Sequence, residues 1–289
     1  HLSEKQGVGS SILPLATMIK IFLKKFKIVN FFYEFFLSLS ENFFLIISKV
    51  GKKLLTLKIF RRLAFNLQSR NKHILLDTNY GMYIVNTSSR IIGKKSYYNN
   101  IPYSTKSVEK VLKILNKENI NFDCFVDIGA NIGTSSISAA FINKNTNFLC
   151  IEGSEENFDL LKKNVKINNL ENRFELHNTL VGSKDNPRLF TEFKEEKGCS
   201  RIFENKEELE RYKKKFGFKV HSVKEVITKK IETILKENLD KKLFFWIDIE
   251  GLDLEILNSD IVKNHSPIFF EFNPTFLKLK YNFYKNNVK

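Results

Sequence analysis

Residues 125–133 read Phe-Val-Asp-Ile-Gly-Ala-Asn-Ile-Gly, an apolar run that leads directly into two glycines. Such a run predicts a buried strand, a tight turn and the start of a helix. Gly129 permits the turn, and Gly133 lets the helix approach the sheet closely. Free N–H groups at the start of the helix favour a polar or anionic ligand. Asp127 places a carboxylate where it can meet the ammonium group of that ligand.

After residue 121 the chain alternates between apolar runs and amphipathic segments, which is typical of an α/β fold with a mostly parallel sheet. A serine at position 154 is expected to cap the second helix. The segment 185–225 is mixed and charged and indicates no clear element. The expected strands are 124–128, 148–151, 174–177, 243–249 and 268–272, and the expected helices are 134–143, 155–169 and 229–238.

An acid follows the second expected strand, about 20 residues after the glycine turn. Glu152 at this point can accept hydrogen bonds from both hydroxyls of a ribose. Strand, turn and acid together predict an adenosine-bearing ligand, which is either S-adenosylmethionine (SAM) or NAD. Asn131 stands where a dinucleotide-binding G-x-G-x-x-G motif has its middle glycine, and this weakens the NAD interpretation.

A second pair of carboxylates ends an almost wholly apolar strand, in the run Phe-Phe-Trp-Ile-Asp-Ile-Glu-Gly of residues 244–251. Asp248 and Glu250 therefore emerge at the end of the strand that faces the ligand crevice of an open α/β sheet. A charged group beside a buried strand usually has a partner or a function, and capping of the next helix is the alternative.

The succession FVDIGANIG, IEGSEENFDLLKKNVKINN, WIDIEGLDLEILN and PIFFEFN resembles the FkbM family of SAM-dependent methyltransferases over about residues 121–273. The resemblance implies a Rossmann-like class I methyltransferase fold, SAM as cofactor, and O-methylation of a sugar or natural-product hydroxyl. It also implies roles for single residues: Asp127, Gly129, Asn131 and Gly133 bracket the methionine end of SAM, Glu152 holds the ribose, Asn178 lies near the adenine, and Asp248 and Glu250 face the methyl group and the acceptor.

The sequence also departs from the family pattern. Trp246 replaces a common lysine, and Gly153 replaces a common proline. Only 17 residues follow Phe272, which is short for the usual last helix and closing hairpin. A hydroxyl is a poor nucleophile until its proton is removed, and Asp248 or Glu250 is the best-placed candidate base. No third ligand for a metal at these carboxylates is evident, and no metal is predicted.

The rest of the chain falls into three expected segments. Residues 1–17 lack periodicity, and we interpret them as a leader of non-native or upstream origin before Met18. Residues 18–67 are basic, with aromatic side chains at helical spacing. We expect helices that pack on the domain or a second subunit, or that rest on a membrane surface; two glutamates disfavour a membrane span. Residues 68–120 predict a β-hairpin within 73–92 and a helix capped by Ser107, before the SAM-binding domain of residues 121–289.

The formal net charge of +15 suggests an anionic partner. A mutational bias toward AT-rich codons, which include those for lysine, explains such a charge equally well. No nucleic-acid-binding motif is present. Three scattered cysteines indicate reduced thiols, hence a cytoplasmic protein with membrane association left open. Two other functions compete with methyl transfer. They are a nicotinamide-dependent oxidoreductase and a non-catalytic membrane- or polymer-binding protein that retains a methyltransferase-like domain.

Overall fold

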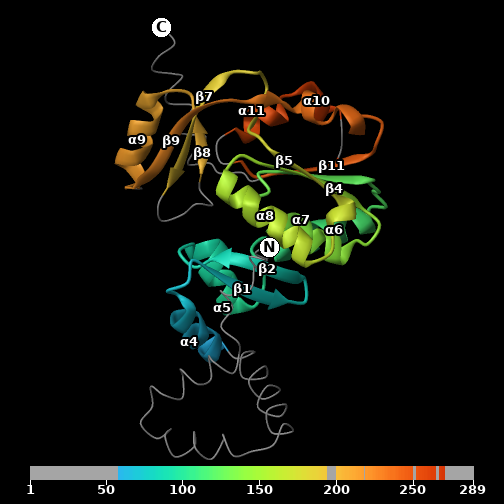
Figure 1. Ribbon diagram of the computed structural model, residues 1–289. Coiled ribbons are helices and arrows are strands. Elements are labelled where there is room, and N and C mark those ends of the chain that lie inside the picture. The colour runs from blue at the N-terminus through green and yellow to red at the C-terminus, as the bar shows by residue number, and fades with distance from the viewer. Residues whose placement is uncertain (1–57, 194–199, 218, 250–251, 265–266, 271–289) are drawn as a thin grey trace, which may run out of the picture. The chain divides into compact units, whose positions relative to one another are not determined.

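The computed structural model describes residues 58–193, 200–217, 219–249, 252–264 and 267–270 (Figure 1). The chain forms two compact units, His1–Thr78 with Ile84–Ile101, and Asn79–Tyr83 with Pro102–Lys289. The expectations for residues 1–57, for Glu250 and for the chain after residue 270 lie outside the described residues.

The first unit contains α4 (Lys58–Gln68), β1 (His73–Thr78), a π-helical turn (Arg90–Lys95) and α5 (Ser96–Asn99), and β1 pairs with β2 (Gly81–Asn86). The helix predicted for the end of the basic segment and the hairpin are therefore confirmed. The buried face of α4 meets α5. The Phe65 ring lies 5.6 Å from the ring of Tyr97, centroid to centroid, and the Arg61 guanidinium donates a hydrogen bond to the Tyr97 carbonyl.

The second unit is built on a five-stranded sheet of order β12-β11-β3-β4-β5, in which every neighbouring pair is parallel. The strands are β3 (Cys124–Ile128), β4 (Asn147–Glu152), β5 (Phe174–Asn178), β11 (Leu243–Ile247) and β12 (Ile268–Phe270). The expected strands and the Rossmann-like α/β fold class are confirmed. The strand order reverses between β3 and β11, and open sheets of this type bind ligands beyond the carboxyl ends at such a point.

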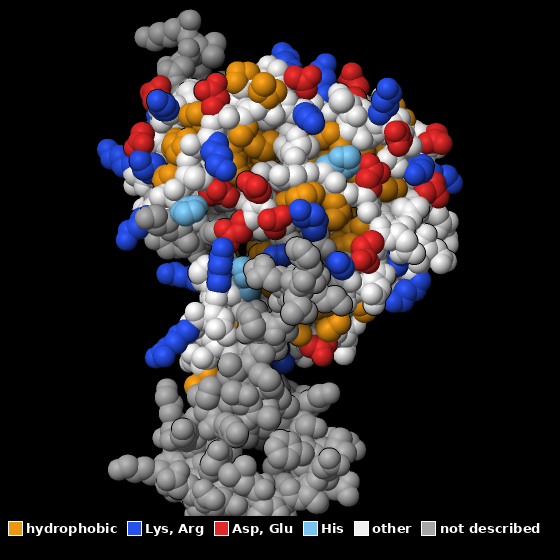
Figure 2. Space-filling model, viewed as in Figure 1, with side chains coloured by type: hydrophobic (Ala, Val, Ile, Leu, Met, Phe, Trp, Pro, Cys, Tyr) orange, Lys and Arg blue, Asp and Glu red, His pale blue; other side chains and the backbone are white. Residues whose placement is uncertain are grey.

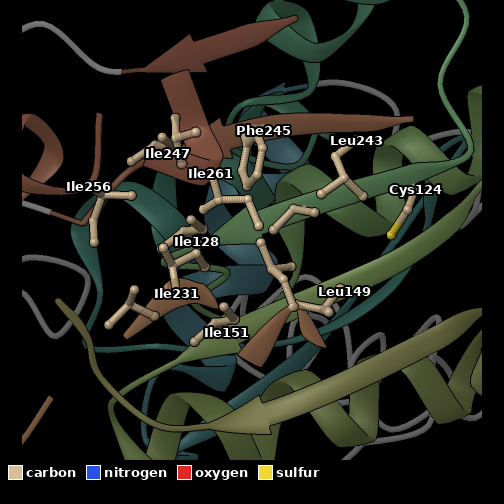
Figure 3. Close-up of a cluster of buried hydrophobic side chains, with 14 residues drawn as sticks. Cys124, Ile128, Leu149, Ile151, Ile231, Leu243, Phe245, Ile247, Ile256 and Ile261 are labelled. Atoms are coloured by element: carbon tan, nitrogen blue, oxygen red, sulfur yellow. The ribbon is translucent and has the colours of Figure 1, made fainter. Parts of the chain in front are cut away.

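Helices cover both faces of this sheet (Figure 1). One face carries α6 (Thr105–Lys117), α7 (Thr134–Ile142) and α8 (Glu155–Ile167), and the other carries α10 (Ile231–Ile234), α11 (Asp253–Leu257) and α12 (Asp260–Lys263). Figure 3 shows the second interface, where Ile128, Ile151 and Phe245 meet Ile231, Ile256 and Ile261. Successive strand residues point to opposite faces, so Asp127 and Cys150 lie under α7 instead.

The segment between β5 and β11 forms a small antiparallel sheet with the order β8-β7-β9. Its elements are β7 (Pro187–Phe193), β8 (Arg201–Phe203), α9 (Lys206–Phe216) and β9 (Val220–Ile227), and we call this substructure the inserted sheet. One side of it packs on α9 through Phe193, Phe203 and Tyr212. The sequence indicated no clear element here. A short parallel pair, β6 (Val181–Gly182) with β10 (Lys229–Lys230), joins the inserted sheet to the rest of the unit.

Three local predictions were wrong. The helix expected to begin at Ser107 begins at Thr105, so Ser107 lies inside α6. Ser154 occupies the N-cap position of α8, but its side chain makes no capping hydrogen bond. The expected helix 229–238 is divided into β10, the four-residue α10 and a 3-10 turn at Lys236–Asn238.

The surface of the described part mixes both signs of charge. Figure 2 shows basic and acidic side chains interspersed over the face in view. None of the helices among the described residues is long and apolar enough to cross a membrane.

Candidate functional site

The turn after β3 brings two strand ends together. Gly129 has a φ of +89°, which L side chains rarely adopt, and a Cβ atom built on it would lie 2.0 Å from the carbonyl oxygen of Asp248. The Asp248 amide in turn donates to the Ile128 carbonyl at 2.9 Å. The ends of β3 and β11 are thus in direct backbone contact at the point where the strand order reverses, and only glycine fits there.

The rest of the loop is held by polar contacts of its own. Asn131 also has a positive φ, of 52°, and its side-chain oxygen accepts a hydrogen bond from the Ile132 amide at 2.9 Å. Asn164 of α8 donates to the Ile132 carbonyl at 2.9 Å. A Cβ atom on Gly133 would lie 2.7 Å from a methyl group of Leu161. The close approach at Gly133 is therefore to α8, and not to the sheet as the sequence suggested.

Glu152 ends β4 and faces this loop. One carboxylate oxygen accepts from the Asn131 amide at 2.8 Å, and the other accepts from the Ser154 amide at 2.7 Å. Burial raises the pKa of Glu152 to about 7, against the lowering effect of these two hydrogen bonds. The Asn157 side chain also hydrogen-bonds to this carboxylate, so about one of its four acceptor positions is left for a hydroxyl of a ligand.

Asp127 lies beneath the loop in the sheet, with Trp246 and Cys150 as its neighbours in β11 and β4. Its side chain is 1% exposed, and its Oδ2 atom has no hydrogen-bond partner in the part of the chain that the structure describes. Burial raises the pKa of Asp127 to about 7, against the lowering effect of hydrogen bonds from Ser136, and the charge of Glu152 contributes to the rise. An orphaned buried acceptor of this kind marks a position that a donor or a proton would stabilise.

The remaining predicted site residues lie at the same edge of the sheet. Asn178 ends β5, and its side-chain amide donates to the Glu152 carbonyl at 2.8 Å. Asp248 is half-buried directly after β11, and its backbone closes on Gly129. Glu250 falls outside the described residues. Trp246 is a packing residue, because its ring stacks on Phe269 with 3.9 Å between the centroids.

Sequence reasoning missed one acidic side chain in this region. Glu192 of β7 accepts a hydrogen bond from the Ser154 hydroxyl at 2.7 Å, and its charge raises the pKa of Glu152. The run Pro187–Phe193 gave no clear signal, because the burial of its residues does not alternate regularly.

The site combines a glycine loop at a helix start with two buried carboxyls and a third acid at the end of β11. These groups suit a ligand that has hydroxyl and ammonium donors. Among the described residues no group of three His, Cys, Asp or Glu side chains is arranged to hold a metal ion.

A comparison with protein families finds that the methyltransferase FkbM domain matches residues 127–283, which is more than half of the chain. No curated protein matches the chain significantly.

Solved structures give weaker likenesses. A protein described as a transferase from Pyrococcus horikoshii is 19% identical over 37% of this chain and 36% of its own, with a TM-score of 0.28. One described as a caffeoyl-CoA O-methyltransferase from Staphylococcus aureus is 13% identical over 67% of this chain and 79% of its own, with a TM-score of 0.36. The Pyrococcus abyssi tRNA (uracil-54, C5)-methyltransferase, solved with S-adenosyl-L-homocysteine (SAH), is 23% identical over 37% of this chain and 24% of its own, with a TM-score of 0.26. The chain thus spans only about a third or less of the first and the third of these proteins. All three TM-scores are too low for these matches to say anything about activity.

Proposed function

The chain belongs to the FkbM methyltransferase family, whose cofactor is SAM, and from this premise we propose that it methylates a hydroxyl oxygen of a sugar or glycan. The observation that carries the proposal is the meeting of the Gly129 turn, Glu152 and Asp248 at the switch point of the sheet. Family membership also decides between SAM and NAD, which the first motifs left open.

The residues at the site fit SAM. Glu152 would accept a hydrogen bond from a ribose hydroxyl, and Asn178 would lie beside the adenine. The loop from Gly129 to Gly133 would border the methionine end, and the Oδ2 atom of Asp127, which has no hydrogen-bond partner among the described residues, would accept from the ammonium group. The cofactor supplies an electrophilic methyl group on a sulfonium sulfur.

The protein has to position the acceptor and remove its proton. Asp248 lies at the end of β11 beside the glycine turn, and a carboxylate at this position is our first candidate to accept the hydroxyl proton. Glu250, two residues later, is the second candidate. Alignment of the acceptor oxygen with the methyl carbon and the sulfur, with water excluded, supplies the rest of the rate enhancement.

The substitution Asp248→Asn tests this assignment. It should leave the affinity for SAH nearly unchanged and reduce turnover by about a hundredfold or more, the usual effect of losing a general base. Asp260→Asn, at an exposed acid of α12, is the matched control and should leave both quantities unchanged. Equal losses of affinity and turnover in Asp248→Asn would assign the residue to cofactor positioning instead.

The acceptor class needs a separate experiment. The protein is incubated with methyl-labelled SAM and a panel of free sugars, glycans and lipid-linked sugars, and transferred label is counted. We expect label in at least one sugar-containing acceptor, in a bond that resists mild base as an ether does. Label that appears only in carboxyl esters or on nitrogen would contradict O-methylation of a hydroxyl.

A further inference from the structure

The inserted sheet is fixed at the carboxyl edge of the central sheet. Phe190 of β7 and Ile202 of β8 form a buried cluster with Leu252, and Leu180 and Ile249 pack against it. Ile249 directly follows Asp248, the candidate base. This side of the inserted sheet therefore packs against the chain segment that directly follows Asp248.

β7 carries two charged side chains on this side, Glu192 and Arg188, and Arg188 is already paired with Glu255 of α11. The pairing of β7 with β9 shifts register between Glu192 and Phe193. The residue left unmatched by this shift is His221 of β9, so the irregularity lies opposite Glu192 and not in β7 itself. Glu192 accepts hydrogen bonds from two hydroxyls, Ser222 of β9 at 2.7 Å and Ser154 at 2.7 Å.

Ser154 connects two carboxylates. Its backbone amide donates to Glu152 and its hydroxyl donates to Glu192, and the residue is fully buried. Glu152 and Glu192 are thus joined through Ser154, whose burial restricts the movement of its side chain. This explains why the Ser154 side chain does not cap α8, although the sequence predicted that it would.

We propose that Glu192 is a positioning residue of the cofactor site, through which the inserted sheet sets the place and the charge of the ribose-binding acid Glu152. This inference rests on the proposed role of Glu152. Other groups also face Glu152. They are the Asn131 amide of the loop, the Ser154 amide and Asn157 at the start of α8, and the carboxyl group of Asp127 in β3. Glu192 differs from these groups because it belongs to the inserted sheet.

The sign of the effect follows from the charge of Glu192. Burial raises the pKa of Glu152 most, and the negative charge of Glu192 adds to that rise. Neutralising Glu192 therefore keeps Glu152 ionised to a lower pH. Because the ionised form accepts from a ribose hydroxyl, the affinity for the cofactor should also persist to lower pH.

The test is calorimetric titration of SAH into the folded protein across about pH 5 to pH 8. Wild type should lose affinity as the pH falls through about 7, the pKa of Glu152. Glu192→Gln should move the midpoint to lower pH by about a few tenths of a unit, because burial contributes more to the raised pKa of Glu152 than Glu192 does. Glu192→Ala, which also removes the charge, should move it in the same direction and serves if the glutamine variant does not fold. Glu225→Gln, at an exposed acid of β9, makes the same charge change in the same sheet and should match wild type.

The outcomes separate the two proposals. Equal midpoints in wild type, both Glu192 variants and Glu225→Gln would overturn the inference and leave the proposed function standing. A wild-type affinity that does not change with pH would overturn the role of Glu152 and the inference with it. Absence of SAH binding by wild type at every pH would overturn the proposed function itself.

Discussion

At the scale of single residues, the site holds two carboxyl groups whose environment favours their neutral forms. Burial raises the pKa values of Asp127 and Glu152 to about 7. The sequence predicted both residues, because an acid just before a glycine turn and an acid after the next strand are local patterns. It did not predict Glu192, whose relation to Glu152 depends on a contact between segments 38 residues apart.

The raised pKa of Asp127 predicts a pH-dependent stability for the ligand-free protein. Asp127 has an ordinary pKa of 3.8 when exposed and a pKa of about 7 in the folded state. Its contribution to stability is fully present below about pH 4 and is lost as the pH rises through about 7, because over this range the unfolded state releases the proton that the folded state still holds. Asp127→Asn should therefore stabilise the protein at about pH 8 by up to a few kcal/mol, and much less at about pH 5.

Urea unfolding at both pH values measures this difference. Asp159→Asn is the control, because Asp159 lies on the exposed face of α8 in an ion pair with Lys162. That control should leave the pH dependence nearly as in wild type. An Asp127→Asn variant that is equally destabilised at both pH values would mean that the carboxylate is ionised and paired in the folded state.

At the scale of elements, the glycine turn between β3 and α7 determines where the strand ends meet. The apolar runs of the central strands made this part of the fold predictable. The inserted sheet was not predictable from its sequence, because its strands are short or half-exposed and alternate charged with apolar residues. Its stability comes from the α9 interface and from Phe190 against Leu252, which are tertiary contacts that local propensity does not record.

A pair of glycine substitutions tests the turn. Gly129→Ala places a methyl group against the backbone of Asp248 and should reduce the free energy of unfolding by about 4 kcal/mol or more, or prevent folding. Gly217→Ala, after α9, has a similarly positive φ of 69° but no atom within 4 Å of the added carbon, so only the backbone strain of about 1–2 kcal/mol is expected. Thermal unfolding with and without SAH measures both effects. Similar losses in the two variants would show that the contact with Asp248 is not tight.

At the scale of the whole molecule, the net charge of +15 and the aromatic segment of residues 18–67 point to an interaction surface outside the methyltransferase domain. The sequence predicts that this segment docks on a second subunit or on an anionic membrane surface, and residues 18–57 lie outside the described part of the chain. A truncation should stop at residue 57, because α4 is held to α5 through Phe65 and Arg61.

The prediction is that removal of residues 1–57 releases the protein from anionic liposomes, or converts a dimer to a monomer, and leaves SAH affinity intact. Flotation with anionic and neutral vesicles, combined with light scattering on both chains, distinguishes these results. A full-length protein that neither floats nor self-associates would show that the segment is not an interface.

The central claim is that SAM binds at the carboxyl ends of β3 and β4 with its ribose on Glu152. Thermal unfolding in the presence of SAH or NAD, for wild type and Glu152→Ala, measures this most directly. A ligand at a hundredfold excess over its dissociation constant stabilises a protein by about 2.7 kcal/mol. We predict that SAH raises the melting temperature of wild type, that NAD does not, and that Glu152→Ala loses most of the SAH effect. An unchanged SAH shift in Glu152→Ala would remove Glu152 from the site and contradict the account.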